Sequence, residues 1–383
     1  MSEPTSDSTL DQEASDHVLP QEEMDEANQM FKAHIPLNRK LLIAAAVLIA
    51  FFGSFMLGQV TRTPGEIFQA TGSYMQKVFE FVIACFQDPS LIKEFAIPMD
   101  KAERVLFNIR LPRILVVMAV GAALSVAGAS YQGMFKNPLT SPDLLGASAG
   151  ASLGACIALL CNMSGEMVQL FAFLGGMTAV GLAVWLNKAV DYDPTLGLVL
   201  AGILVGTLFQ SGTSLVKFMA DADDKLPTIT FWLMGSFANI NKRDFWIIVI
   251  PMLLGFVTLL LQSWKLNVLS FGDEEARAMG VNTKRTRLLV IFASTLITST
   301  SVAVAGIVGW IGLLIPHLAR AVVGPNYKVL LPTSMFIGAV YLLLEDNIAR
   351  LIATVEIPIG ILTAILGVPF FIVIFKHNMK GWR

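Results

Sequence analysis

This chain of 383 residues has few charged residues, few cysteines and few histidines for its length. Only 15% of its residues are Asp, Glu, Lys or Arg, and it contains 3 cysteines and 4 histidines. Cys85, Cys156 and Cys161 lack metal-ligand spacing and leave one residue over after any pairing, so neither a zinc site nor a disulfide framework is supported. The net charge of -2 provides no basic excess, which argues against a nucleic-acid partner.

Motifs for covalent chemistry and for ATP hydrolysis are also missing from the sequence. No G-x-x-x-x-G-K-[ST] phosphate loop occurs, so we expect that the chain does not hydrolyse ATP itself. His17 and His34 lie in a polar N-terminal segment and His377 lies near the C-terminal end. We therefore predict no enzymatic activity, no catalytic residue, no metal site and no cofactor bound by this chain.

Long apolar stretches dominate the rest of the sequence. Hydrophobic residues make up 55% of the chain and the mean hydropathy is +0.65, more apolar surface than one globular core of this length can bury. A helix needs about 20 apolar residues to cross a bilayer. Such stretches occur at roughly 40–60, 113–134, 144–162, 167–187, 196–220, 246–264, 286–305, 329–345 and 357–376. A shorter stretch at 306–322 contains Pro316, so we predict an all-α polytopic membrane protein of about ten transmembrane helices.

The segments outside these stretches suggest an orientation. Residues 1–39 are acidic and poor in large apolar residues, so we expect a disordered tail. Apart from the long segment 61–109, Lys and Arg favour the loops on the same side as the N-terminus, which predicts cytoplasmic N- and C-termini. The segment 61–109 is then extracytoplasmic, and we expect an amphipathic surface helix in it. The alternative of a crossing at 75–87 is disfavoured, because the stretch is short and carries Lys77 and Glu80.

Two sequence signatures point to a known family. The first runs from Arg110-Leu-Pro-Arg113 through a helix rich in small residues to the loop 137–146, and the second is the Pro-containing stretch 306–320. Small residues allow helix backbones to approach closely in lipid. Together with the last crossing, which begins near Pro358, these signatures resemble the FecCD-type permeases. The residues that carry the resemblance are Pro112, Asn137, Pro138, Gly312, Pro316, His317, Arg320, Pro358 and Gly360. From its position we expect His317 to be a structural hydrogen-bonding residue.

The resemblance covers about residues 40–383 and implies a function and partners. FecCD-type permeases are the transmembrane subunits of type II ABC importers, which also include cobalamin permeases. It implies that the chain moves an iron-siderophore, haem or corrinoid across the cytoplasmic (inner) membrane by alternating access at a dimer interface. It also implies a second permease copy, identical or related, two ATPase subunits that bind ATP and Mg²⁺, and an extracytoplasmic substrate-binding protein.

A short segment at 272–280 is the candidate contact with the ATPase, within an expected cytoplasmic loop at 265–286. It consists of Gly272, Asp273, Glu274, Glu275, Ala276, Arg277, Ala278, Met279 and Gly280. Asp273 is expected to cap a helix that Gly280 ends. From the residues alone, docking and an ordinary surface loop are equally supported, and the resemblance favours docking.

Three arginines near the expected outer face have two interpretations. Arg110, Arg113 and Arg350 could anchor helix ends or pair locally with Asp346 or Glu356. The resemblance implies instead that they receive acidic side chains of the binding protein, which would orient the encounter.

The crossing at 196–220 is the candidate for the transport path. It carries Gly202, Gly206, Gln210, Ser211, Thr213 and Ser214. Uncharged polar residues can line a wet path without the cost of a buried charge, although ordinary helix packing explains them almost as well. The resemblance favours the path and implies a gate in the preceding loop, at Asp193, Pro194 and Thr195.

The alternative function is an ion-coupled secondary transporter. Such a protein needs ionisable groups near the middle of the bilayer to bind the coupling ion. The expected crossings carry no obvious Asp or Glu in their interior, which argues against this alternative.

Overall fold

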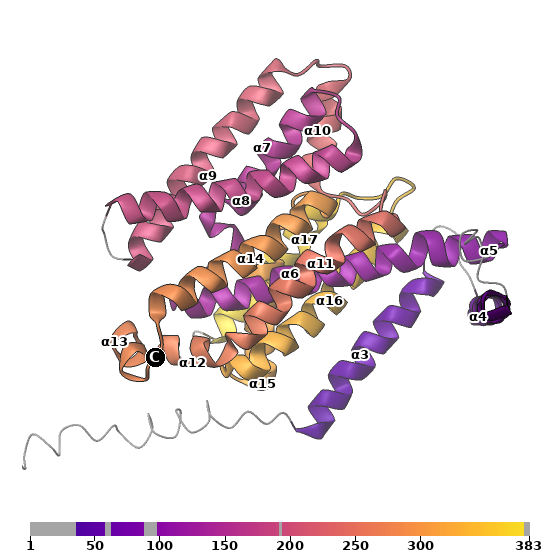
Figure 1. Cartoon of the computed structure of the whole chain (residues 1–383), viewed down its shortest axis with the longest axis horizontal. Coiled ribbons are helices and arrows are strands. Elements are labelled where there is room, and N and C mark those ends of the chain that lie inside the picture. The colour runs from indigo at the N-terminus through magenta and orange to yellow at the C-terminus, as the bar shows by residue number, and fades with distance from the viewer. Residues whose placement is uncertain (1–35, 58–62, 88–97, 191–193, 379–383) are drawn as a thin grey trace, which may run out of the picture.

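The computed structural model describes residues 36–57, 63–87, 98–190 and 194–378. The regular elements in these ranges are all helices, and most run along a common direction (Figure 1). In the first half they are α3 (Leu37–Met56), α4 (Pro64–Gln87), α5 (Lys101–Arg104), the π-helix η2 (Val105–Arg110), α6 (Leu111–Phe135), the 3-10 helix η3 (Pro142–Leu145), α7 (Ala147–Leu160), α8 (Gly165–Val190) and α9 (Pro194–Met219). In the second half they are α10 (Lys225–Met234), α11 (Lys242–Leu261), α12 (Ser263–Phe271), α13 (Asp273–Ala278), α14 (Thr283–Ala305), α15 (Ile311–Val323), α16 (Tyr327–Leu351) and α17 (Ile359–Asn378).

The predicted fold class is confirmed. Within the described residues, 7 helical segments are long and apolar enough to cross a membrane. Shorter apolar helices at 147–160, 311–323 and 359–373 occupy the positions of the remaining predicted crossings. The acidic segment 1–39 lies outside the described residues except for 36–39, which include the first residues of α3.

α6 forms the centre of the molecule. Its side chains are buried almost continuously from Pro112 to Phe135, because α14, α15, α16 and α11 all pack around it. α7, α8, α9 and α10 form a second group beside this core (Figure 1). Close packing depends on glycine: a Cβ added to Gly128 would lie 1.8 Å from the carbonyl oxygen of Gly312 in α15. No larger residue fits at this crossing of the two signature segments.

The proline in α15 is accommodated by its neighbours. Pro316 has no N–H and disturbs the hydrogen bonds of the preceding turn. The side-chain nitrogen of Gln132, in α6, lies 3.3 Å from the carbonyl oxygen of Leu313 in that turn. On the other side, His317 Nε2 lies 3.0 Å from the carbonyl oxygen of Pro138, which links α15 to the loop after α6. The structural role predicted for His317 is therefore present in the structure.

Three predicted crossings differ in extent from the observed helices. The second crossing begins at Lys101, because α5, η2 and α6 form one helical segment of 35 residues. α7 has 14 residues and is shorter than a full crossing. α16 continues to Leu351, so Glu345, at the end of the predicted crossing 329–345, and Asp346, just beyond it, are inside the helix and buried. The expectation that the crossings carry no interior acidic residue is therefore wrong for α16.

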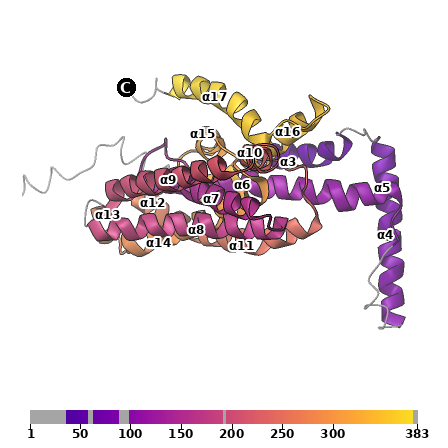
Figure 2. The same cartoon turned by 90° about the horizontal axis from the view of Figure 1, so that it is seen from above.

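Helices outside the crossings complete the fold. The helix predicted in the segment 61–109 is present as α4, which lies across one end of the bundle and perpendicular to most other helices (Figure 2). The short helices α10 and α12 were not predicted. α10 precedes the turn at Gly235, where a positive φ of 75° lets the chain pass close to the carbonyl oxygen of Ile307.

Candidate translocation site

A cavity of about 560 Å³ lies between α9, η3 and α7. Five of the residues predicted for the transport path line it, namely Gly202, Gly206, Gln210, Thr213 and Ser214. Ser211 is not among the lining residues, because it points from a different face of α9. Asp193 lies outside the described residues, and Pro194 and Thr195 begin α9.

The α9 wall combines close packing with a polar stripe. A Cβ on Gly202 would lie 2.3 Å from the carbonyl oxygen of Leu144, so this glycine lets α9 approach η3. Further along the same face, the hydroxyl of Thr213 donates to the carbonyl oxygen of Phe209 at 3.1 Å, and Ser214 donates to that of Gln210 at 3.1 Å. Because these hydroxyl hydrogens are used within the helix, the oxygens remain available as acceptors in the cavity. Close packing and a polar cavity wall therefore coexist on one helix, and a transport path along this wall stays a prediction.

The opposite wall was not predicted to line the path. Ser141, Asp143, Ser148 and Ser152 from η3 and α7 face the same cavity. The hydroxyl of Ser148 donates to Asp143. Ser141 and Asp143 belong to the loop 137–146 of the first signature, whereas Ser148 and Ser152 lie in α7. The spacing of four between the hydroxyls at 148 and 152 is the signal that could have placed these two on one helix face.

Irregular backbone borders the same cavity. The chain leaves α14 at Gly306, whose φ is 70°, and Ile307 then lines the cavity before α15 begins. In a bilayer, non-helical backbone is tolerated where it is buried in protein or lines an aqueous cavity. The α9 stripe and this break both give the cavity wall polar groups that can form hydrogen bonds.

The 272–280 segment forms a defined helical turn. α13 covers Asp273–Ala278, and Gly280 ends it with a φ of 79°. The N–H of Val281 donates to the carbonyl oxygen of Ala276 at 2.9 Å, and the N–H of Gly280 donates to the carbonyl oxygen of Arg277 at 2.9 Å. This pair of hydrogen bonds is the pattern of a Schellman motif. The predicted cap at Asp273 is wrong: Gly272 occupies the N-cap, and Asp273 is the first helical residue.

Asp273 instead braces the segment against α14. Its carboxylate accepts a hydrogen bond from Arg287 Nη2 at 2.8 Å. α12, which precedes the segment, is held to the start of α16: Asn267 donates to Asn326 at 2.9 Å and accepts from the N–H of Tyr327 at 2.8 Å. Polar contacts therefore connect α13 to α14 and the preceding α12 to the start of α16.

The outward surface of the 272–280 segment is exposed in the part of the chain that the structure describes. Glu274, Glu275, Arg277 and Met279 are exposed, whereas Ala276 is buried against the bundle. Beside it lies a second cavity of about 480 Å³ with basic side chains, Lys265 and Arg285, in its wall. The exposed side combines acidic, basic and apolar groups, as a protein interface requires.

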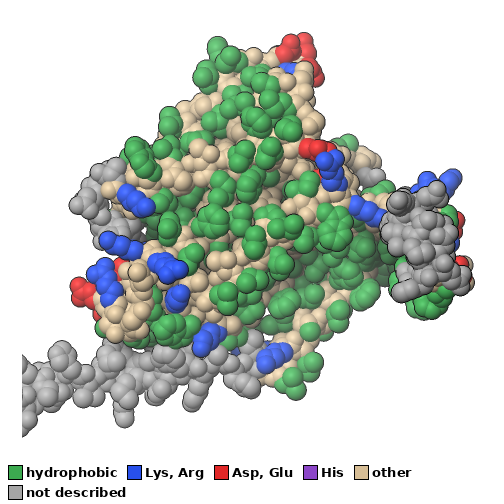
Figure 3. Space-filling view, viewed as in Figure 1, with side chains coloured by type: hydrophobic (Ala, Val, Ile, Leu, Met, Phe, Trp, Pro, Cys, Tyr) green, Lys and Arg blue, Asp and Glu red, His purple; other side chains and the backbone are tan. Residues whose placement is uncertain are grey.

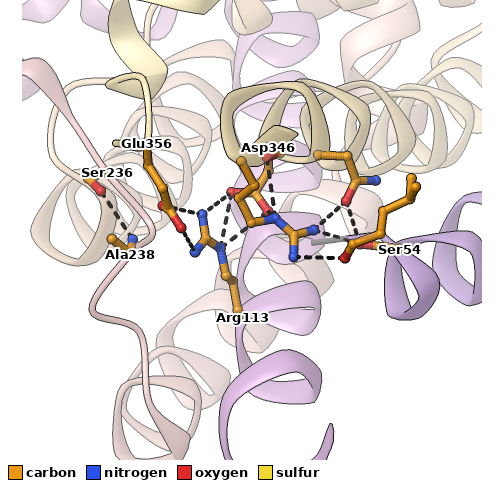
Figure 4. Close-up of polar contacts among 9 residues, drawn as sticks. Ser54, Arg113, Ser236, Ala238, Asp346 and Glu356 are labelled. Carbon is orange, nitrogen blue, oxygen red and sulfur yellow. Dashed lines mark hydrogen bonds and ion pairs between the residues drawn. The ribbon is translucent and has the colours of Figure 1, made fainter. Parts of the chain in front are cut away.

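The three predicted docking arginines are buried at the other end of the bundle. Arg113 is bound by two carboxylates: its Nη2 lies 2.8 Å from Asp346 and 2.7 Å from Glu356 (Figure 4). Arg350 Nε lies 3.1 Å from the Asp346 carboxylate. We call Arg113, Arg350, Asp346 and Glu356 the ion cluster.

Neutral groups complete the surroundings of these arginines. Arg350 Nη2 donates to Ser54 at 3.1 Å and also to Asn347. Arg110 donates to the carbonyl oxygen of Phe55 in the last turn of α3. Local pairing, one of the two interpretations of the sequence, is therefore present; contact with a binding protein stays a prediction. Glu356 is the most accessible member of the ion cluster, with 25% of its side chain exposed.

The apolar helices, the polar cavity and the surface helix braced against α14 are features of a membrane transport protein. The FecCD transport family matches residues 46–377, and the chain belongs to this family. It is a permease subunit of the ABC importer type, in which a separate subunit hydrolyses ATP.

Individual relatives agree with this assignment and differ in substrate. The chain is 40% identical over 291 residues to the molybdate import system permease protein MolB of Haemophilus influenzae, covering 76% of this chain and 86% of MolB. It is 36% identical to the hemin transport system permease protein HmuU of Yersinia pestis, and the match covers 71% of this chain and 83% of HmuU. It also resembles a solved structure described as an inward-facing conformation of a metal-chelate type ABC transporter, with a TM-score of 0.75 and 34% identity, covering 88% of this chain and 98% of that one.

Proposed function

We propose that this permease imports an iron-siderophore, haem or corrinoid across the cytoplasmic membrane, through a passage that two permease subunits form between them. The observation that carries the proposal is the cavity along α9, which combines mostly uncharged polar side chains and irregular backbone with one acidic residue, Asp143, and one basic residue, Lys217. A chelate of this class presents many hydrogen-bonding groups on its surface, and a lining rich in hydroxyl, amide and backbone groups can bind such groups. The relatives include a hemin permease and a cobalamin permease, which supports this class.

The second subunit in this proposal is another copy of the chain or a related permease. α9 exposes a row of large apolar side chains beside the polar stripe, including Leu204, Leu208 and Phe218, of which Phe218 is 87% exposed. Because the cavity opens beside this row, a partner subunit packed near it would close the passage from the other side. Both termini are proposed to be cytoplasmic.

Energy would enter through the 272–280 segment. Two ATPase subunits that bind ATP and Mg²⁺ would each engage one such segment, and their closure would move α13 against α14 and α16. The contacts of Asp273 with Arg287 and of Asn267 with Asn326 support the proposal, because a braced helix transmits a displacement that a flexible loop would absorb. The resulting change is a switch between two packings biased by nucleotide.

Docking of an extracytoplasmic binding protein through Arg110, Arg113 and Arg350 needs a rearrangement. Arg113 already holds two carboxylates, so an incoming acidic side chain would have to replace Glu356, the more exposed of the two. If Arg113 receives the binding protein, Glu356→Gln should tighten docking; unchanged affinity in a titration of the purified importer would assign Arg113 to internal pairing.

Reconstitution tests the proposal and its alternative together. Liposomes containing the permease, its ATPase and its binding protein should accumulate one of the three chelate classes only with ATP. Accumulation of molybdate alone would reject the chelate class and leave ATP-driven import intact. Accumulation by the permease alone, driven by an ion gradient, would show that the protein is a secondary transporter. Such a transporter binds its coupling ion near the middle of the bilayer. Glu345, one of the buried acids in α16, lies instead about 9 Å from the end of that helix.

A further inference from the structure

α4 is the one long helix of the described chain that does not run with the bundle. It lies across the end that carries α5, and its C-terminal half extends beyond the face formed by α11 and α14 (Figure 2). α4 does not qualify as a membrane span, although it has 24 residues. Its direction and its position therefore need an explanation other than crossing the bilayer.

One face of α4 is fixed to the rest of the chain. Glu103, which is buried in α5, accepts hydrogen bonds from Ser73 and from Lys77, the latter at 2.9 Å. Tyr74 stacks on Phe107 with ring centroids 4.3 Å apart. The hydrogen bond with Glu103 raises the pKa of Lys77, so this contact stays charged at any physiological pH. The rotation of α4 about its own axis is therefore set by its contacts with α5 and η2.

A second face of α4 is apolar and has no partner within the described residues. Phe68, Met75, Phe79 and Ile83 recur at helical spacing and are exposed, Phe68 at 83% and Phe79 at 66%. Gln69, Gln76 and Glu80 occupy a third, polar face, where Gln76 donates to Glu80 at 2.9 Å. At 100° per residue the polar face lies between the anchored face and the apolar face, so the apolar face points away from α5 and η2. An apolar face directly beside a polar face is the arrangement of a helix at a boundary between lipid and water.

The depth of α4 matches such a boundary. Arg110 donates to a carbonyl oxygen in the last turn of α3, where that membrane span ends. The partners of α4, Phe107 and Glu103, precede Arg110 by three and seven helical residues, which places them roughly 5–10 Å beyond this level. The headgroup layer extends roughly 5–8 Å beyond the hydrocarbon core on each side.

The bundle surface beside the projecting C-terminal half of α4 favours lipid over a protein partner. α11, on the face that α4 extends past, exposes Trp246, Ile250 and Leu254, each by more than half. Figure 3 shows hydrophobic side chains spread over this face of the bundle, as a lipid-facing surface requires. A helix projecting past this face lies above the lipids that cover it.

We propose that α4 is an interfacial helix that inserts its apolar face into the outer leaflet of the bilayer beside α11, and so anchors the outer end of the α5–α6 helix at a defined depth. The occupant of this face is the headgroup and upper acyl region of the lipid. The proposal is independent of the substrate and of the ATPase contact.

Spin-label accessibility in the reconstituted full-length protein tests this proposal. Single cysteines at Met75 and at the adjacent Gln76 would be compared, with Leu254→Cys as the lipid-facing reference, in a background carrying Cys85→Ser, Cys156→Ala and Cys161→Ser. The label at 75 should be accessible to oxygen and protected from a water-soluble nickel complex, as at 254, whereas the label at 76 should show the reverse. Equal exposure of 75 and 76 to the nickel complex would overturn the proposal.

Two further measurements separate lipid from protein as the occupant. Addition of the binding protein should leave the label at 75 accessible to oxygen; protection from both reagents would show that a protein covers this face and would reject the lipid assignment. If the cysteine variants fail to fold, wild-type protein can be cross-linked in vesicles with a phospholipid that carries a photoreactive group high on its acyl chain. Labelling should occur in the peptide 64–87, and its absence there, with α11 labelled, would reject the proposal.

Discussion

The ion cluster makes a quantitative prediction about stability. Asp346 is 1% exposed and neutralises both Arg113 and Arg350, whereas Glu356 is 25% exposed and contacts only Arg113. Removing the charge of one buried partner leaves an uncompensated buried charge, which typically costs about 3–5 kcal/mol. Asp346→Asn removes the carboxylate that balances the charge of two buried guanidinium groups, so we expect the free energy of unfolding to fall by about 3–5 kcal/mol. Glu356→Gln removes a partly exposed charge and should cost about 1 kcal/mol or less.

Thermal unfolding in detergent, followed by size-exclusion fluorescence, can measure this difference. At about 2 °C per kcal/mol for a large domain, Asp346→Asn should lower the midpoint by roughly 6–10 °C and Glu356→Gln by about 2 °C. The double variant Arg113→Met/Asp346→Asn should lose less than the sum of its single variants, because contacting residues are coupled by about 0.5–3 kcal/mol. Equal midpoints for Asp346→Asn and Glu356→Gln would contradict the assignment of Asp346 as the centre of the cluster.

Three other substitutions test separate parts of the structure. Arg287→Ala removes the brace on Asp273, so ATP hydrolysis by the assembled importer should continue while substrate moved per ATP falls; an unchanged ratio would mean that the brace does not transmit force. Gly128→Val should lower the free energy of unfolding by more than about 3 kcal/mol, because the valine side chain would meet the α15 backbone. Gly181→Ala, which has open space around its Cβ, should leave stability unchanged or raise it in the same unfolding assay. Gln210→Leu makes the cavity wall apolar, so uptake in vesicles should fall with no change in the unfolding midpoint; full uptake would remove Gln210 from the path.

Much of the fold follows from composition alone. A bilayer demands about 20 apolar residues per crossing, so the stretches that became α3, α8, α9, α11 and α14 could be located from hydropathy. The small residues of α6 predicted close helix contact, and the approach of Gly128 to Gly312 is such a contact. Pro316 and Gly280 act locally, through a missing N–H and a positive φ, so their effects on helix geometry could also be anticipated.

Pairings between distant residues could not be predicted in this way. Arg113 and Asp346 are 233 positions apart, and nothing in either local pattern selects a partner in the chain over one in another protein. The same holds for the cavity, because Ser148 and Thr213 belong to different helices whose relative rotation depends on packing. The predicted cap at Asp273 was wrong because Gly272 takes the N-cap position, and the Asp273 carboxylate instead accepts a hydrogen bond from Arg287.

The amino-acid sequence by itself determined that this chain is a bundle of membrane-crossing helices with two family signatures, because the cost of burying polar backbone in lipid acts on every local segment. Only the tertiary structure decided which charges are neutralised internally, which hydroxyls share a cavity and which face of α4 is left for lipid. Those outcomes depend on how whole helices pack and rotate against one another, a collective property of the folded chain.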